Sequence, residues 1–120
     1  MKATAIFASL VVTLASPAAA EETFPSRPVS LVVPIAPGGG LDAVARMVAR
    51  KFSAALNQPI VVENRAGGSQ NIGIRTVAKA TGDGYTLLYS SNTITINPAL
   101  FTNLGYDVNS AGLMVMVFDE

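Results

Sequence analysis

VSLVVPIAPGGGLD, residues 29–42, decides the fold of this 120-residue chain. The nearly continuous apolar run Val29–Ile35 is typical of a strand buried on both faces, as in a parallel sheet. Pro34 has no backbone N–H, so it fits only where that strand is already ending. A glycine turn follows, and a helix is expected directly behind it. This strand–loop–helix unit is a general anion-binding arrangement, because loop N–H groups that point outward and the helix dipole both favour negative charge.

The segment Leu41–Leu56 has the period of an amphipathic helix. Asn57 and Pro59 are expected to stop it. The basic residues Arg46, Arg50 and Lys51 lie off the apolar face and are interpreted as solvated. The predicted core-facing residues are Leu41, Val44, Ala45, Val48, Phe52, Ala55 and Leu56.

The rest of the chain alternates between strand-like and helix-like segments. In order, they are a strand Ile60–Glu63, a loop Asn64–Gln70, a helix Asn71–Ala80, a strand Tyr85–Tyr89, a polar run Ser90–Thr93 and a short helical turn Asn97–Phe101 with Pro98 at its start. The resulting order predicts an α/β fold, a right-handed βαβαβ layer on a parallel sheet.

The first 20 residues have the features of a secretory signal peptide. Lys2 provides a minimal basic start, and Ala3–Ala15 forms an apolar stretch too short to span a bilayer, which needs about 20 residues. Pro17 breaks this stretch, and Ala18–Ala20 supplies the small residues of a cleavage site before Glu21. We therefore expect an exported, periplasmic protein that begins at residue 21.

The composition indicates binding rather than catalysis. The chain has 8 basic and 8 acidic residues without a basic run, which gives no electrostatic footprint for nucleic acid. It has no Cys and no His, which removes most metal sites and the usual nucleophile–base pairs. The acidic residues are scattered without ligand spacing. We therefore expect no catalytic residues, no metal and no cofactor.

Ligands of open parallel sheets bind beyond the carboxyl ends of the strands. Three polar loops leave such ends in the predicted fold, so they form a plausible binding rim. The candidate ligand-binding residues are Ala36, Pro37, Gly38, Gly39, Gly40, Asp42, Ser90, Ser91 and Asn92. Structural interpretations also apply to three residues here: Asp42 as a loop-fixing residue at the helix dipole, Arg65 as a surface residue, and Asn71 as a helix N-cap.

A second interpretation of the glycine loop is open. Residues 38–43 satisfy G-x-G-x-x-A, and Glu63 follows about 20 residues later, where a dinucleotide-binding fold places its ribose-binding acid. This pattern would make the chain a fragment of a Rossmann-like enzyme. Export argues against a nicotinamide cofactor, and Pro34 and Pro37 distort the tight turn that the fingerprint needs. A P-loop is excluded, because no Gly-Lys-Ser/Thr follows.

The same residues carry a resemblance. Residues 29–42 resemble the opening of the Bug/TctC family, the periplasmic solute-binding receptors of tripartite tricarboxylate transporters. Further matching stretches follow in the family's order and spacing. They are Gln58–Arg65 (QPIVVENR), Asn71–Gly73 (NIG), Asp83–Leu88 (DGYTLL) and Asn97–Leu100 (NPAL).

The resemblance implies a two-lobed, Venus-flytrap receptor that closes on a small carboxylate and delivers it to membrane permease subunits. The family's ligands include citrate-like acids, dicarboxylates, acidic amino acids and aromatic carboxylates. In the family, the loop after the first strand holds a ligand carboxylate, partly through ordered water. Carried over, that loop is Ala36–Asp42, and Ser90–Asn92 would add hydroxyl and amide donors.

The sequence departs from the family pattern in three places. Leu41 stands where Thr is common, and Ser69-Gln70 replaces a more glycine-rich loop. After Asp107 the pattern is lost. We therefore expect a signal peptide at 1–20, a partial, truncated N-terminal lobe at 21–107 with weak or no binding, and a divergent tail at 108–120. Leu113–Phe118 would be an exposed strand without partners, and pairing through it would make the chain a stand-alone interaction domain.

Overall fold

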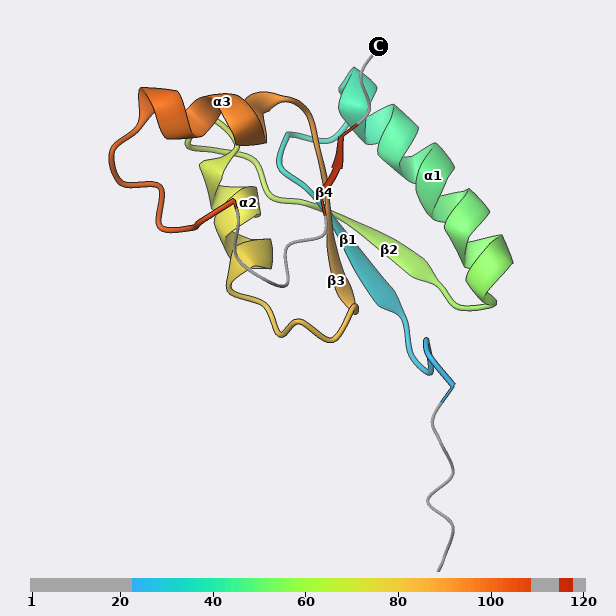
Figure 1. Ribbon diagram of the computed structural model, residues 1–120. Helices are drawn as coiled ribbons and strands as arrows, with labels where there is room; N and C mark the ends of the chain where they lie inside the picture. Colours follow the sequence, from blue (N-terminus) through green and yellow to red (C-terminus); the bar gives the residue numbers. More distant parts are fainter. Residues whose placement is uncertain (1–22, 109–114, 118–120) are drawn as a thin grey trace, which may run out of the picture.

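A computed structural model describes residues 23–108 and 115–117 (Figure 1). The predicted order of strands and helices is confirmed, and a third helix and a fourth strand follow. The elements are β1 Val29–Val33, α1 Gly40–Leu56, β2 Ile60–Asn64, α2 Asn71–Ala78, β3 Thr86–Ser90, α3 Thr93–Leu100 and β4 Val115–Val117. The predicted signal peptide lies outside the described residues.

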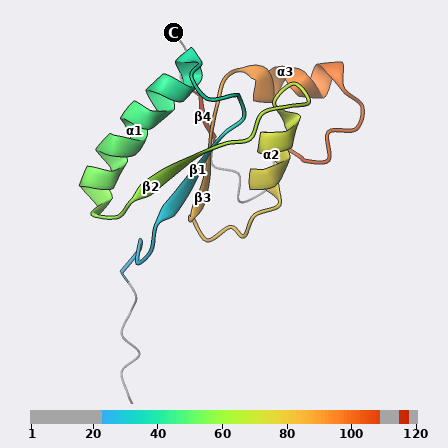
Figure 2. The same ribbon diagram turned by 180° about the vertical axis from the view of Figure 1, so that it is seen from behind.

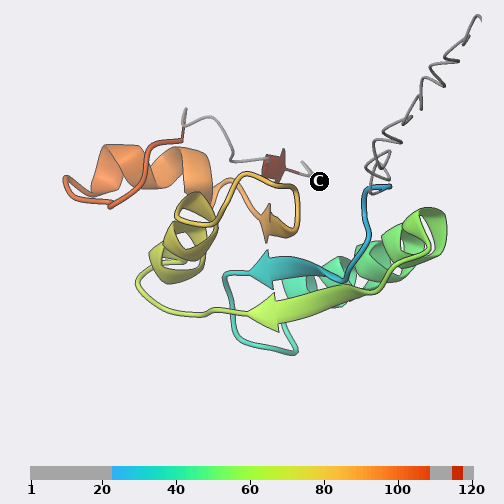
Figure 3. The same cartoon turned by 90° about the horizontal axis from the view of Figure 1, so that it is seen from below.

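The four strands form one parallel sheet in the order β2-β1-β3-β4. The chain crosses from β1 to β2 in one direction, and from β2 past β1 to β3 in the other. Right-handed crossovers in opposite directions place their helices on opposite faces of a sheet. Accordingly, α1 lies on one face, and α2 and α3 lie on the other (Figures 1 and 3). The predicted α/β class with a parallel sheet is confirmed.

The central strand β1 explains why both faces need cover. Leu31 and Val33 point into a core beneath α1, whereas Val32 points into a second core beneath α2, and all three side chains are buried. Burial of each such side chain contributes roughly 1.5–3 kcal/mol. The core beneath α1 also contains Ala45, Ala49 and Tyr89, and the core beneath α2 contains Ile74, Val77, Leu88 and Ile94. The continuous apolar run of β1 therefore reflects two cores rather than one.

The element ends follow local backbone chemistry. The strand β1 ends at Val33, directly before Pro34, as the missing N–H of proline predicts. Helix α1 ends at Leu56, and Asn57 adopts the left-handed conformation, with φ of 51°. That conformation is a common way to terminate a helix, and Asn tolerates it better than most residues.

The prediction for residues 97–101 was wrong in its boundaries. Helix α3 begins at Thr93, and Pro98 lies inside it rather than at its start. Ser90 belongs to β3 and Thr93 to α3, so the polar run between them is shorter than predicted. Pro98 lacks the N–H that would bond to the carbonyl four residues earlier, and α3 ends two residues beyond it, at Leu100.

The predicted core face of α1 was wrong at three positions. Val44 and Leu56 are 44% and 39% exposed, and Ala55 is exposed as well. Ala49, which was not on the predicted face, is buried. The reason is that α1 packs on β1 and β2, so its apolar stripe is wider than the part of the sheet beneath it.

The prediction that Leu113–Phe118 lacks partners was wrong for its centre. Val115–Val117 forms β4 and pairs in parallel with β3 in the register Leu88↔Val115 to Ser90↔Val117. The free N–H and C=O groups along that side of β3 explain the pairing.

Within the two described ranges, no helix has the length and apolarity needed to cross a membrane.

Gly73 lies where α2 closely approaches the loops that follow β1 and β2. A Cβ atom there would lie 2.7 Å from Cβ of Pro34 and 2.9 Å from the carbonyl oxygen of Arg65. We predict that Gly73→Ala lowers the free energy of unfolding by about 1–3 kcal/mol, the usual cost of overpacking. Urea unfolding followed by circular dichroism measures this change. The control is Gly40→Ala, because nothing lies within 4 Å of a Cβ there; equal losses in both variants would contradict the prediction.

Candidate functional site

Three loops meet at the carboxyl ends of β1, β2 and β3, on one edge of the sheet (Figures 1 and 2). They are residues 34–39, 65–70 and 91–92. Because β1 lies between β2 and β3, the first loop is flanked by the other two. We call these three loops the rim. It is the edge on which sequence reasoning placed all the candidate residues.

The first loop of the rim turns at Gly38, whose φ of +91° favours glycine. Gly39 and Gly40 do not have positive φ. The Gly38 N–H donates to Oδ2 of Asp42 at 2.9 Å, so this N–H does not point outward as predicted. The N–H groups of Gly40 and Leu41, at the start of α1, have no hydrogen-bond partner among the residues described. Those two groups retain the donor capacity of a helix N-terminus.

Asp42 fixes the loop, as predicted, and its side chain is the centre of a hydrogen-bond network. Its carboxylate also accepts from Nε of Arg46 at 3.1 Å and from Nδ2 of Asn64 at 2.9 Å. The same Asn64 Nδ2 donates to the carbonyl of Ile35 at 3.2 Å, and Arg46 Nη2 donates to Oδ1 of Asn64 at 3.0 Å. Loop, helix α1 and the end of β2 are therefore joined through one carboxylate.

The network keeps Asp42 ionised. Hydrogen bonds from Arg46, from the Gly38 N–H and from Asn64 together lower the pKa of Asp42 from 3.8 to about 2. The residue itself is only 3% exposed. A carboxylate whose accepting oxygens are already occupied is a poor proton acceptor and repels a second anion. Asp42 therefore serves the loop, and a ligand anion would meet backbone N–H groups instead.

The second loop is held by buried amides, and the predicted role of Asn71 was wrong. The N-cap of α2 is Gln70, with φ of 70°, and no side chain caps the helix. Asn71 is buried instead, and its Oδ1 accepts from Nδ2 of Asn97 at 2.7 Å and from the Tyr106 hydroxyl at 2.9 Å. Asn97 Nδ2 also donates to the carbonyl of Ser69 at 2.9 Å. This cluster fastens the second loop to α3.

The third loop and the strand end before it contain two of the candidate hydroxyls. The Ser90 hydroxyl is buried and donates to Oε1 of Gln70 at 3.2 Å. Ser91 accepts a longer bond, 3.4 Å, from Nε2 of Gln70 and shares a 3.0 Å bond with Thr93. Asn92 is exposed, and its side chain caps nothing. The structure thus brings the second and third loops together through Gln70, leaves Asn92 facing solvent, and engages Ser90 within the protein.

Glu63, the acid of the dinucleotide interpretation, is engaged on both oxygens. Ser30 donates to Oε1 at 2.8 Å and Arg65 donates to Oε2 at 3.1 Å, and these bonds lower the pKa of Glu63. Arg65 is exposed, which fits the surface role predicted for it. Ser30 belongs to β1, so Glu63 ties the two strands together.

Three cavities of the described part of the chain lie away from the rim. One is lined by α1 and β2, one by the outer side of α2, and the third is apolar and lies near Phe24. None of them includes a candidate site residue. Residues 23–108 and 115–117 also contain no cluster of acidic side chains that could hold a metal ion. The rim, by contrast, is an open surface, because residues 36–38, residues 65–69 and Asn92 are exposed.

The parallel α/β fold is shared with periplasmic binding proteins of known structure. Residues 44–117 match the family described as "Tripartite tricarboxylate transporter family receptor", TctC. The match covers more than half of the chain, which therefore belongs to the TctC family. Members of this family are receptors rather than enzymes, which argues against the dinucleotide-binding interpretation.

Individual relatives are similar over most of this chain. Protein BugT of Bordetella pertussis is 42% identical over 97 residues, which are 79% of this chain and 29% of that protein. The structure of the periplasmic binding protein BugD is 39% identical, with a TM-score of 0.64 over 70% of this chain and 28% of that one. MatC of Rhodopseudomonas palustris with bound malate is 43% identical, with a TM-score of 0.53 over 54% and 22%. The chain spans about a third of the length of the curated relatives it matches.

Sequence reasoning missed the side chains that hold the rim in place. Arg46 was interpreted as solvated; it is exposed, yet it bonds to Asp42 and Asn64. Gln70, Asn97 and Tyr106 were not assigned any role. A weak signal existed, because amides placed directly after strands or at helix starts often bond to neighbouring backbone. Their partners lie 20 or more residues away in sequence, which no local pattern reveals.

We predict that Asp42 makes the stability of the chain pH-dependent. The folded-state pKa is lowered, so its contribution is fully present above pH 3.8 and is lost as the pH falls toward 2. Asp42→Asn should be less stable than the wild type at about pH 6 and should lose less stability as the pH falls from 3.8 to about 2. Urea unfolding midpoints across this range measure the effect.

Glu63→Gln is the variant for comparison, because the pKa of Glu63 is also lowered, but by hydrogen bonds from different partners. The two substitutions should flatten the pH profile independently, and the double variant should be flatter than either. A profile of Asp42→Asn parallel to that of the wild type would show that Asp42 is not responsible.

Proposed function

We propose that this chain forms the carboxylate-binding rim of a periplasmic receptor for small dicarboxylates. In this proposal, residues 36–42 hold one ligand carboxylate through backbone N–H groups, in part through bridging water. Ser91 and Asn92, which directly follow β3, add donors from the third loop, whereas Ser90 supports that loop through its bond to Gln70. The ligand would then pass to the membrane permease subunits of a tripartite transporter.

The geometry of the first loop carries this proposal. Gly38 turns the chain directly into the N-terminus of α1, where the N–H groups of Gly40 and Leu41 remain available. Asp42, Arg46 and Asn64 hold that loop in place before any ligand arrives. Preorganised N–H donors at a helix N-terminus suit a carboxylate and do not need an arginine.

The choice of ligand class rests on a relative. MatC, which is 43% identical over the shared part, is described with bound malate, a four-carbon dicarboxylate. One rim leaves most of such a ligand in water, whereas binding sites usually bury roughly 70–90% or more of a ligand. We therefore expect a dissociation constant of about 1 mM for this chain alone, roughly −4 kcal/mol.

A relative and the first 20 residues support the proposed location. BugD is described as a periplasmic binding protein. The features of residues 1–20 support export through a cleaved signal peptide, and residues 21–107 would be part of an N-terminal lobe. Detection of a mature product that begins at Glu21 in the periplasm would support this part of the proposal, whereas an uncleaved cytoplasmic product would contradict it.

A titration of isotope-labelled chain with malate tests the site directly. We predict that malate shifts the amide resonances of Gly40, Leu41 and Ser91 in a saturable way, because Gly40 and Leu41 directly follow the first loop of the rim and Ser91 lies in the third. Dimethyl malate, which has no charge, is the ligand control and should leave these resonances unchanged. Shifts spread over the whole chain, or none at about 10 mM malate, tenfold above the expected dissociation constant, would contradict the proposed site.

Gly38→Ala tests the loop itself. The positive φ of Gly38 strains any other residue, so the turn should open and the malate-induced shifts should fall about threefold or more. The matched control is Gly84→Ala, because Gly84 has a similar φ of +81° but precedes β3, at the opposite end of the sheet. Equal loss of binding in both variants would indicate general destabilisation.

A further inference from the structure

On the face of the sheet where α1 lies, helices cover some strands and not others. Helix α1 packs on β1 and β2, and α2 packs on β3 and β1 from the opposite side. Leu87, near the start of β3, faces the α1 side, where it is only half-buried. In the part of the chain that the structure describes, Tyr89 near the end of β3 is buried beneath α1, but no helix lies over the start of β3 on this face. Parallel sheets are normally covered on both faces.

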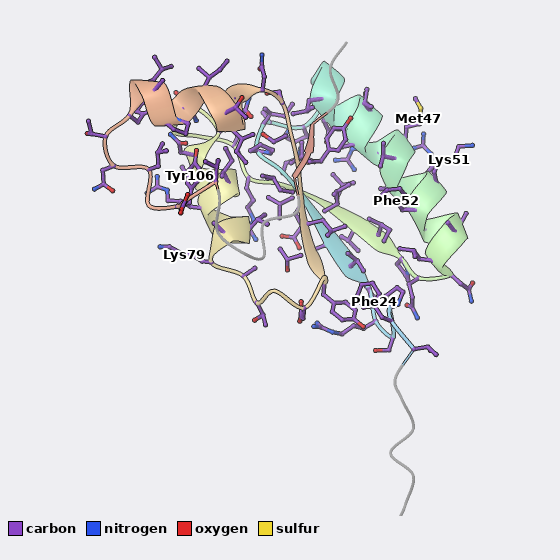
Figure 4. All side chains as sticks on the ribbon, in the orientation of Figure 1. Phe24, Met47, Lys51, Phe52, Lys79 and Tyr106 are labelled. Atoms are coloured by element: carbon purple, nitrogen blue, oxygen red, sulfur yellow. The ribbon has the colours of Figure 1, made fainter. Side chains whose placement is uncertain are left out.

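A groove occupies the uncovered position. It has a volume of about 480 Å³, and every residue that lines it is apolar or glycine. Helix α1 contributes Phe52, Ala55 and Leu56, β3 contributes Leu87, and the segment before β1 contributes Phe24. In Figure 4, Phe52 and Phe24 come from two different elements, α1 and the segment that leads into β1. We call this the α1–β3 groove.

The exposed apolar residues of the groove are held in defined positions. Phe24 is 59% exposed, yet its ring packs edge to face on Tyr85 with 5.0 Å between ring centroids. Ala55 and Leu56 are two residues that sequence reasoning placed in the core and that the structure exposes. An apolar helix stripe that continues beyond its own sheet contact is typical of a surface built to be covered.

We propose that the α1–β3 groove is the seat of an amphipathic helix from the receptor sequence that the relatives carry beyond the part matched here. The chain accounts for about a third of the relatives' length, so about two thirds of the receptor sequence is available to supply it. A helix fits this place because α1 already forms the helical layer on this face, and a second helix packs beside it at the usual distance of about 8–10 Å. This inference rests on family membership and the groove, and not on ligand binding at the rim.

Co-expression tests the proposal. The tagged full chain is produced together with the remainder of BugT, taken from the point where its match to this chain ends. We expect the two polypeptides to co-purify and to elute together in size-exclusion chromatography. Ala55→Glu should weaken their association about tenfold or more, because it places a carboxylate in the groove.

The matched control is Ala54→Glu, which introduces the same side chain at an exposed neighbouring position that does not line the groove. It should leave the association unchanged. Association that is absent, or that falls equally in both variants, would overturn the proposal. So would a homodimer of this chain that Ala55→Glu dissociates, because the groove would then seat a second copy.

A single-chain version makes the test independent of the remainder folding by itself. The same BugT segment is fused after Val117, and the unfolding midpoint is measured with Ala55→Glu and with Ala54→Glu. We expect the first substitution to lower the midpoint and the second to leave it unchanged. Equal midpoints would overturn the proposal. The malate titration reads the opposite end of the sheet, so failure there and failure here remain distinguishable.

Discussion

The arrangement of the rim depends on the bonds of one carboxylate. Asp42 accepts from the loop at Gly38, from its own helix through Arg46, and from the end of β2 through Asn64. The first loop, the start of α1 and the end of β2, which lies 22 residues further along the chain, are thereby fixed to each other. The carboxylate is ionised and buried, so the bonds to it are stronger than neutral ones, and losing one partner would leave a buried charge uncompensated.

Buried hydrogen bonds also hold the second and third loops of the rim in place, as the bonds to Asp42 hold the first loop. Asn71 accepts from Asn97 and Tyr106, and Gln70 bonds to Ser90 and Ser91. Within the described residues, no buried side-chain nitrogen or oxygen lacks a hydrogen-bond partner. Satisfied buried networks of this kind hold one arrangement, because any alternative leaves a polar group without a partner. Hydrogen bonds within the protein therefore hold the rim in one arrangement, although one side of the rim faces solvent.

The two ends of the sheet differ in character. The carboxyl end is polar and closely bonded, whereas the α1–β3 groove near the amino end is apolar and open. In the two proposals made above, the polar end would bind a charged ligand, and the apolar groove would pack against a helix from the rest of a TctC receptor. A parallel sheet produces this division naturally, because its loops collect at one edge while its faces stay apolar.

The sequence by itself determined the class of fold, the position of the glycine loop and the family. The apolar run of β1 and the period of α1 are local patterns, and local patterns set strands, helices and their order. Tertiary structure alone decided which polar residues hold the rim, that α3 begins at Thr93, that β4 joins β3, and which part of the apolar stripe of α1 stays exposed. Most of those features depend on contacts between residues that are distant in the chain, such as Asp42 with Asn64, Asn71 with Asn97, and β3 with β4. Burial and pairing at such positions are properties of the folded arrangement, and no short stretch of sequence encodes them.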